Sequence, residues 1–125
     1  MKGQKELEQR VVRFSKEIAE WLNLEHTDVR ISFNRDTGDP DFPDTACETA
    51  AKWEYSSATM TWNLDNIVGT KRHQLEELIL HEYVHILLGP LDEYIPNKAH
   101  ATARCEFVTE NLARLLIRQW RKYRK

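Results

Sequence analysis

Two histidines and a glutamate stand at the spacing of a metal site in one short stretch of the chain. His81 and His85 are four residues apart, and Glu82 directly follows the first of them. In a helix, residues four apart lie on the same face, so both imidazoles can bind one metal ion. The Glu82 carboxylate then lies beside that ion, where it can accept a proton from a metal-bound water. This combination is suited to hydrolysis by an activated water.

The residues around this motif predict a helix from about residue 73 to 88, ended by Gly89 and Pro90. The predicted helix is apolar on nearly every side, which is typical of a buried helix. Two histidines and a glutamate lose their hydration there, and a divalent metal is a partner that compensates for the loss. The simpler alternative is that His81 and His85 are hydrogen-bonded core residues that bind no metal.

The remaining elements predict an α+β domain that spans residues 1–125. An amphipathic helix is expected over residues 4–23, and alternating residues predict a strand over 28–34. Two further alternating segments, 51–55 and 58–64, predict a hairpin. A last helix is expected from about residue 97 to 120, and the segments 35–46 and 91–97 are predicted loops. The sheet is expected to be small, three-stranded and mostly antiparallel.

Two histidines do not hold a catalytic zinc alone, because three protein ligands and a water are usual. The candidates for the third ligand are His100, Cys105, Glu106 and Glu110. Glu106 and Glu110 share one face of the last helix with small residues that allow close approach to the motif helix. We therefore expect Glu106 to bind the metal and Glu110 to accept a hydrogen bond from a ligand histidine. His100 ranks second as the third ligand, Glu110 third and Cys105 last.

The helical repeat also assigns residues to the other faces of the last helix. The main core stripe is expected to consist of Val108, Leu112, Leu115 and Leu116. His100 falls on a different, polar face, which argues against it if the helix begins at Asn97. The basic segment that follows, residues 118–125, is interpreted as a solvated helix end, with a nucleic-acid partner as the weaker alternative.

The composition excludes some classes of protein and indicates a compartment. The net charge of −2 gives no reason to expect nucleic-acid or membrane binding by the chain as a whole. No apolar run approaches the ~20 residues of a membrane span, and the first residues lack the apolar region of a signal peptide. Cys47 and Cys105 fit reduced thiols, so a cytoplasmic location is expected.

At the motif and the glutamate helix, the chain resembles zincin metallopeptidases of the gluzincin kind, in a minimal form. The resemblance covers residues 28–117 in layout, and its specific part is His81-Glu82-Tyr83-Val84-His85 with Glu106-Phe107-Val108-Thr109-Glu110. Thermolysin-like enzymes carry ExxxD on the second helix, where this chain has ExxxE. The resemblance implies a zinc-dependent peptidase with a peptide or protein substrate, in which Glu82 activates a zinc-bound water.

The resemblance also implies how the substrate binds. In zincins an extended substrate pairs with the strand before the motif helix, which would be residues 58–64 here. A further group normally stabilises the oxyanion, and Tyr55, Tyr94 and His73 are the candidates for that role.

Two alternatives remain open at this point. The SprT-like family has a histidine as its third ligand, and the fourteen residues between His85 and His100 suit that family. The basic C-terminal segment would then agree with an association with DNA. The other alternative is a catalytically silent zincin fold that serves as a binding module. The presence of Glu82 argues against it, because a purely structural metal site has no need of that carboxylate.

Overall fold

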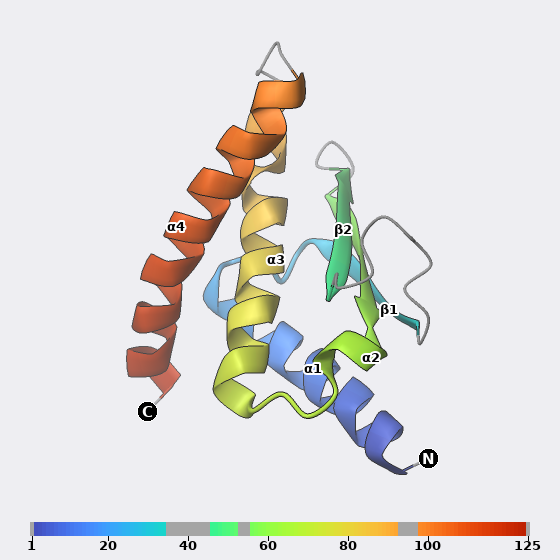
Figure 1. The fold of residues 1–125 in the computed structure, drawn as a ribbon. Helices are drawn as coiled ribbons and strands as arrows, with labels where there is room; N and C mark the ends of the chain where they lie inside the picture. Colours follow the sequence, from blue (N-terminus) through green and yellow to red (C-terminus); the bar gives the residue numbers. More distant parts are fainter. Residues whose placement is uncertain (1, 35–45, 53–55, 93–97, 125) are drawn as a thin grey trace.

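The computed structural model describes residues 2–34, 46–52, 56–92 and 98–124, and the side chains in these ranges apart from residues 2, 91–92 and 98–105. The elements follow in the order α1 (Lys2–Trp21), β1 (Asp28–Asn34), β2 (Cys47–Lys52), β3 (Ser57–Asn63), α2 (Leu64–Ile67), α3 (Arg72–Asp92) and α4 (Lys98–Arg124). Figure 1 shows α3 between α4 on one side and the sheet on the other. The predicted α+β class is confirmed for the described ranges.

The three described strands form one mixed sheet in the order β1-β3-β2. β3 is central, because it pairs in parallel with β1 and antiparallel with β2. The prediction of a mostly antiparallel sheet is therefore wrong for one of the two pairings. Alternation along a strand determines which of its faces is buried, but it carries no information on the direction of the neighbouring strand. The predicted hairpin is found as β2 and β3, although β2 begins earlier than expected and residues 53–55 lie outside the description.

The core lies where α1, the inner face of the sheet and α3 meet. α1 buries the apolar stripe predicted from its spacing, with Val11 and Ile18 fully buried. β3 alternates as a half-buried strand should, so Ala58, Met60 and Trp62 face the core. The sheet and α1 thus form a rigid base against which α3 packs.

The motif helix α3 is longer than predicted. Its start is stabilised by a hydrogen bond from the Lys71 backbone N–H to Gln74 Oε1 at 3.0 Å, one half of a capping box. Gly89 and Pro90 do not end the helix, which continues to Asp92. Proline lacks an N–H and so removes one intrahelical hydrogen bond, and only two residues of the helix follow it. Although α3 is largely apolar, no helix in the described ranges is long and apolar enough to cross a membrane.

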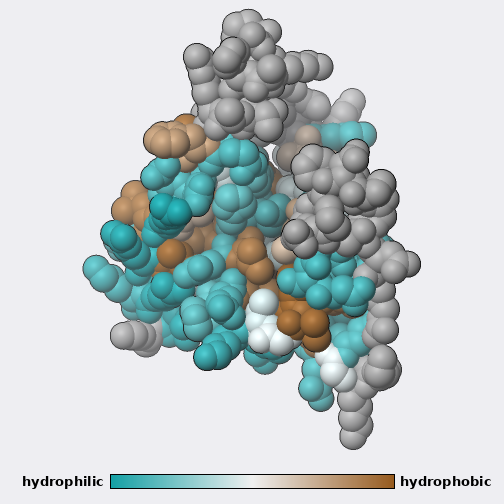
Figure 2. All heavy atoms as spheres, viewed as in Figure 1, coloured by the Kyte–Doolittle hydropathy of each residue, from teal (hydrophilic) through white to brown (hydrophobic). Residues whose placement is uncertain are grey.

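The packing face of α4 differs from the predicted stripe. Of the four predicted residues, Leu112 and Leu116 are half-buried and Leu116 packs against the core, but Val108 and Leu115 are 47% and 55% exposed. The buried side chains of α4 are instead Thr109, Ala113, Ile117 and Trp120. Figure 2 shows the resulting apolar surface on α4 at the left edge of the view. The small side chains of Thr109 and Ala113 allow α4 to lie close to α3, which the longer leucines would prevent. The face that carries Glu106, Ala113 and Ile117 is therefore the one turned to α3, as the small residues on it predicted.

The basic end of α4 is attached to the start of α3. Arg121 lies 2.5 Å from Glu77, and Arg124 lies 3.2 Å from the buried Glu76. Trp120 also donates a hydrogen bond to Glu76, and its ring lies 5.5 Å from that of Trp21. The prediction of a solvated helix end is wrong for Arg121, Arg124 and the aromatic rings of this segment, which make intramolecular contacts.

Candidate metal centre

α3 presents His81 and His85 on one face, one turn apart. Their ring centroids are 4.9 Å apart and their planes are inclined by 76°. The two side chains are 28% and 26% exposed, while the neighbouring Leu80 and Val84 are fully buried. The helical repeat of 3.6 residues thus separates a core face from a face with two accessible imidazoles.

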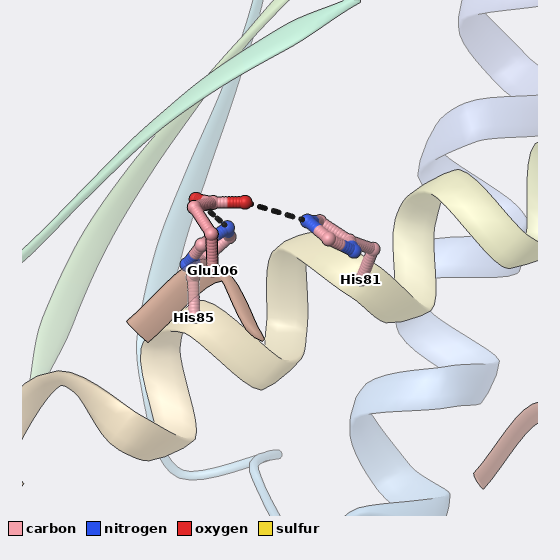
Figure 3. A group of neighbouring side chains, drawn as sticks. All are labelled: His81, His85 and Glu106. Carbon is pink, nitrogen blue, oxygen red and sulfur yellow. Dashed lines mark ion pairs between the residues drawn. The ribbon is translucent and has the colours of Figure 1, made fainter. Parts of the chain in front are cut away.

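Glu106 reaches both imidazoles from α4, as Figure 3 shows. Its Oε2 lies 3.8 Å from His81 Nε2, and its Oε1 lies 3.2 Å from His85 Nε2. One ligand atom from each of the three residues lies within 4.8 Å of the other two. Among the residues whose side chains are described, no other three histidines, cysteines or acids are grouped in this way.

The spacing of these atoms fits a bound metal ion. A tetrahedral ion with bonds of about 2.0–2.1 Å keeps its ligand atoms about 3.3 Å apart. The 3.2 and 3.8 Å distances join the histidines to different oxygens of Glu106, and the three ligand atoms lie within 4.8 Å of one another, so the side chains would move closer together around an ion. Two imidazoles and one carboxylate are ligands that zinc and other divalent transition metals accept. Glu106 is 54% exposed, so its carboxylate is accessible to solvent.

Glu82 projects from α3 toward the sheet, beside the two histidines. Its Oε1 accepts a hydrogen bond of 2.6 Å from the hydroxyl of Thr49 on β2. Burial raises the pKa of the Glu82 carboxyl above its ordinary value, and the charge of Glu106 adds to the rise. The hydrogen bond from Thr49 and the imidazoles of His85 and His81 lower the pKa, but the net direction is upward.

A cleft of about 830 Å³ opens between β2, α3 and α4 and includes His81 and Glu82 in its wall. Its apolar part is formed by Leu78 of α3 with Ala113 and Ile117 of α4. Its polar part includes Cys47, Gln74, Glu77, Glu110 and Arg114. The volume is in the range of small-molecule and peptide side-chain sites, so the reactive groups are accessible to a substrate of that size.

The other candidates from the sequence lie elsewhere or outside the description. Glu110 accepts a hydrogen bond from Arg114 at 2.6 Å and is not part of the group around the histidines. His100 and Cys105 lie in the α4 backbone, and their side chains are outside the description. Tyr55 and Tyr94, two candidates for oxyanion stabilisation, are also outside it. The third, His73, is exposed in the first turn of α3, about 12 Å along the helix from His81.

Sequence reasoning missed Thr49 and Cys47, which the structure places at the site. Both belong to β2, whose half-buried positions are Cys47, Thr49 and Ala51. The alternation of Glu48, Ala50 and Lys52 with these three was a signal for a strand. The prediction began this strand at residue 51, and so the hydroxyl of Thr49 was not considered as a partner of Glu82.

Comparison with protein-family models, with curated proteins and with solved structures finds no match to this chain. Function is therefore inferred from the geometry of the site. That geometry is a group of two imidazoles and a carboxylate, an adjacent carboxyl with a raised pKa, and an open cleft beside them.

Proposed function

We propose that this protein is a zinc-dependent metallopeptidase, with His81, His85 and Glu106 as the metal ligands and Glu82 as the general base. The observation that carries the proposal is the convergence of three ligand atoms within 4.8 Å next to a carboxylate held on the adjacent face of α3. A purely structural zinc site usually has a fourth protein ligand. Among the side chains that the structure describes, no fourth ligand joins the group and a carboxylate stands beside it, which favours catalysis.

In the proposed reaction, Glu82 moves the proton. A bound zinc ion supplies a water whose pKa is lowered from 15.7 toward about 7 and a positive charge for the substrate carbonyl oxygen. The Glu82 carboxylate would accept the proton of the attacking water while Thr49 holds its Oε1. It would then pass that proton to the leaving amine.

The substrate proposed is an extended peptide that pairs with β2. β3 does not serve this purpose, because both of its edges are already paired, so the expectation for residues 58–64 is wrong. β2 is an edge strand, and within the described ranges it pairs with β3 alone. It also lies against α3, close to Glu82. An edge strand beside the catalytic groups offers main-chain hydrogen bonds to a peptide regardless of its sequence.

The backbone register shows which residues of β2 are available. The Asn63 N–H donates to the Ala46 carbonyl at 2.8 Å, which makes these two a hydrogen-bonded pair of the antiparallel ladder. Because such pairs alternate, Glu48 and Ala50 direct their main-chain groups to β3. The main-chain groups of Cys47, Thr49 and Ala51 then point to the free edge.

The first test is the metal content of protein purified without added metal. We expect near one zinc per chain in the wild type, loss in Glu106→Ala and retention in Glu110→Ala. The control is well matched, since the two glutamates lie one turn apart and are 54% and 56% exposed. His100→Ala is measured in parallel, and loss of zinc there instead of in Glu106→Ala would favour the SprT-like alternative.

The second test is peptide hydrolysis by the zinc-loaded protein against a library of unstructured peptides. Wild type is expected to cleave, and Glu82→Gln is expected to bind zinc normally while losing at least 100-fold in kcat. Full zinc binding with no cleavage of any peptide by the wild type would contradict the peptidase proposal and favour a binding module.

A further inference from the structure

Thr49 contributes to two parts of the proposed site, the base Glu82 on α3 and the free edge of β2. Its side chain donates a 2.6 Å hydrogen bond to Glu82 Oε1 across the gap between β2 and α3. Its main-chain N–H and C=O point to the free edge of β2, by the alternation established from the Ala46–Asn63 pair. Thr49 therefore contacts the base with its side chain and directs its backbone to the edge of β2 at which a peptide is proposed to pair.

The hydrogen bond restricts Glu82 in a way that the helix does not. A glutamate side chain has three rotatable bonds, and a single helical position leaves its carboxylate several arrangements. A hydroxyl 2.6 Å from Oε1 selects one of them and occupies that oxygen as an acceptor. The Cys47 thiol lies 3.8 Å from the Thr49 hydroxyl and also hydrogen-bonds Glu82, but a thiol is a weaker donor than the Thr49 hydroxyl.

We propose that Thr49 is the positioning residue of Glu82, and that pairing of a peptide with the backbone of Thr49 fixes the base and the scissile bond relative to each other. This inference rests on the proposed peptidase function. It adds a requirement on the substrate, which must be extended and unstructured at the cleavage point in order to add a strand to β2.

The kinetic test compares Thr49→Val with Thr49→Ser. Valine keeps the shape of threonine without the hydroxyl, and serine keeps the hydroxyl. We expect kcat to fall about 10- to 100-fold in Thr49→Val, with KM within twofold of the wild type and zinc content unchanged. Thr49→Ser should recover kcat to within about threefold. Thr59→Val, the same change on an exposed outward position of β3, is the control and should leave kcat unchanged.

A second readout uses the zinc-free protein and needs no activity. NMR side-chain couplings of Glu82 should report one dominant rotamer in the wild type and in Thr49→Ser, and an average over several in Thr49→Val. If the wild type cleaves peptides but Thr49→Val has the same kcat and the same Glu82 couplings, the inference is overturned. If the wild type cleaves nothing, the peptidase proposal fails. The Glu82 couplings would then still test whether Thr49 holds Glu82 in one rotamer. Equal couplings in the wild type and Thr49→Val would reject that role too.

Discussion

The indole N–H of Trp120, near the end of α4, donates a hydrogen bond to the carboxylate of Glu76, near the start of α3. Glu76 is fully buried, and the guanidinium groups of Arg124 and Arg72 lie 3.2 and 3.5 Å from it. One buried carboxylate therefore joins the end of α4 to the start of α3. Glu106 also lies on α4, about 21 Å along the helix from Trp120. The contact between Trp120 and Glu76 therefore helps to set the register in which α4 presents Glu106 to the histidines.

Glu76→Ala is expected to lower the free energy of unfolding by about 3 kcal/mol, because the buried indole N–H and the two arginines lose their acceptor. Glu76→Gln keeps an acceptor and should cost about 1 kcal/mol. Urea unfolding followed by tryptophan fluorescence measures both. Glu77→Ala is the control, because its pair with Arg121 is half exposed and should contribute less than about 1 kcal/mol. Equal losses for Glu76→Ala and Glu77→Ala would contradict the anchoring role.

Zinc should stabilise the folded protein, because its three ligands come together only when α3 and α4 are packed. At free zinc 100-fold above Kd, the free energy of unfolding should rise by about 2.7 kcal/mol. Glu106→Gln should lose most of this increase at the same zinc concentration, and chelation should abolish it in the wild type. Glu110→Gln should behave as the wild type, since Glu110 is paired with Arg114 outside the group. If zinc raised the free energy of unfolding equally in Glu106→Gln and Glu110→Gln, Glu106 would not be a metal ligand.

Cys47 should react slowly with thiol reagents. Burial raises the pKa of its thiol, and the neighbouring Glu82 carboxylate raises it further. Since the thiolate is the reactive form, Cys47 in a Cys105→Ser background should be labelled at pH 8 at least tenfold more slowly than in the urea-unfolded chain. Adding Glu82→Gln removes a negative charge and should speed labelling several-fold. Glu77→Gln, in the same cleft, should have little effect; an equal acceleration there would mean that general loosening of the cleft controls the rate.

Tyr83 should make stability fall at alkaline pH. Burial raises its pKa from 10.0 to about 12, so the folded state keeps a proton that the unfolded state loses between these values. The contribution is fully present below pH 10 and is lost as the pH rises through about 12. Between pH 9 and pH 11 the wild type should lose roughly 1.3 kcal/mol more than Tyr83→Phe. Urea unfolding at the two pH values checks this, and equal losses would show that Tyr83 titrates normally.

Local sequence patterns predicted the helices and strands whose buried face is marked by regularly spaced apolar residues. The stripe of α1 and the strand β1 were both predictable, because periodic burial leaves a clear spacing of apolar residues. The α4 helix shows the limit of that reasoning. Its largest apolar residues, including Leu115, were assigned to the core by hydrophobicity, but the partner helix selects the face with small residues at 109 and 113.

The sequence by itself determined the core of the candidate metal centre. The spacing of His81 and His85 places both imidazoles on one side of any helix, and the position of Glu82 follows from the same repeat. Only the tertiary structure decided which residues from outside the helix complete the site. Glu106 from α4 and Thr49 from β2 are 21 and 33 residues away from His85 and Glu82. Their approach depends on how α4 packs and on which strand lies at the edge of the sheet, and neither is encoded in a local repeat.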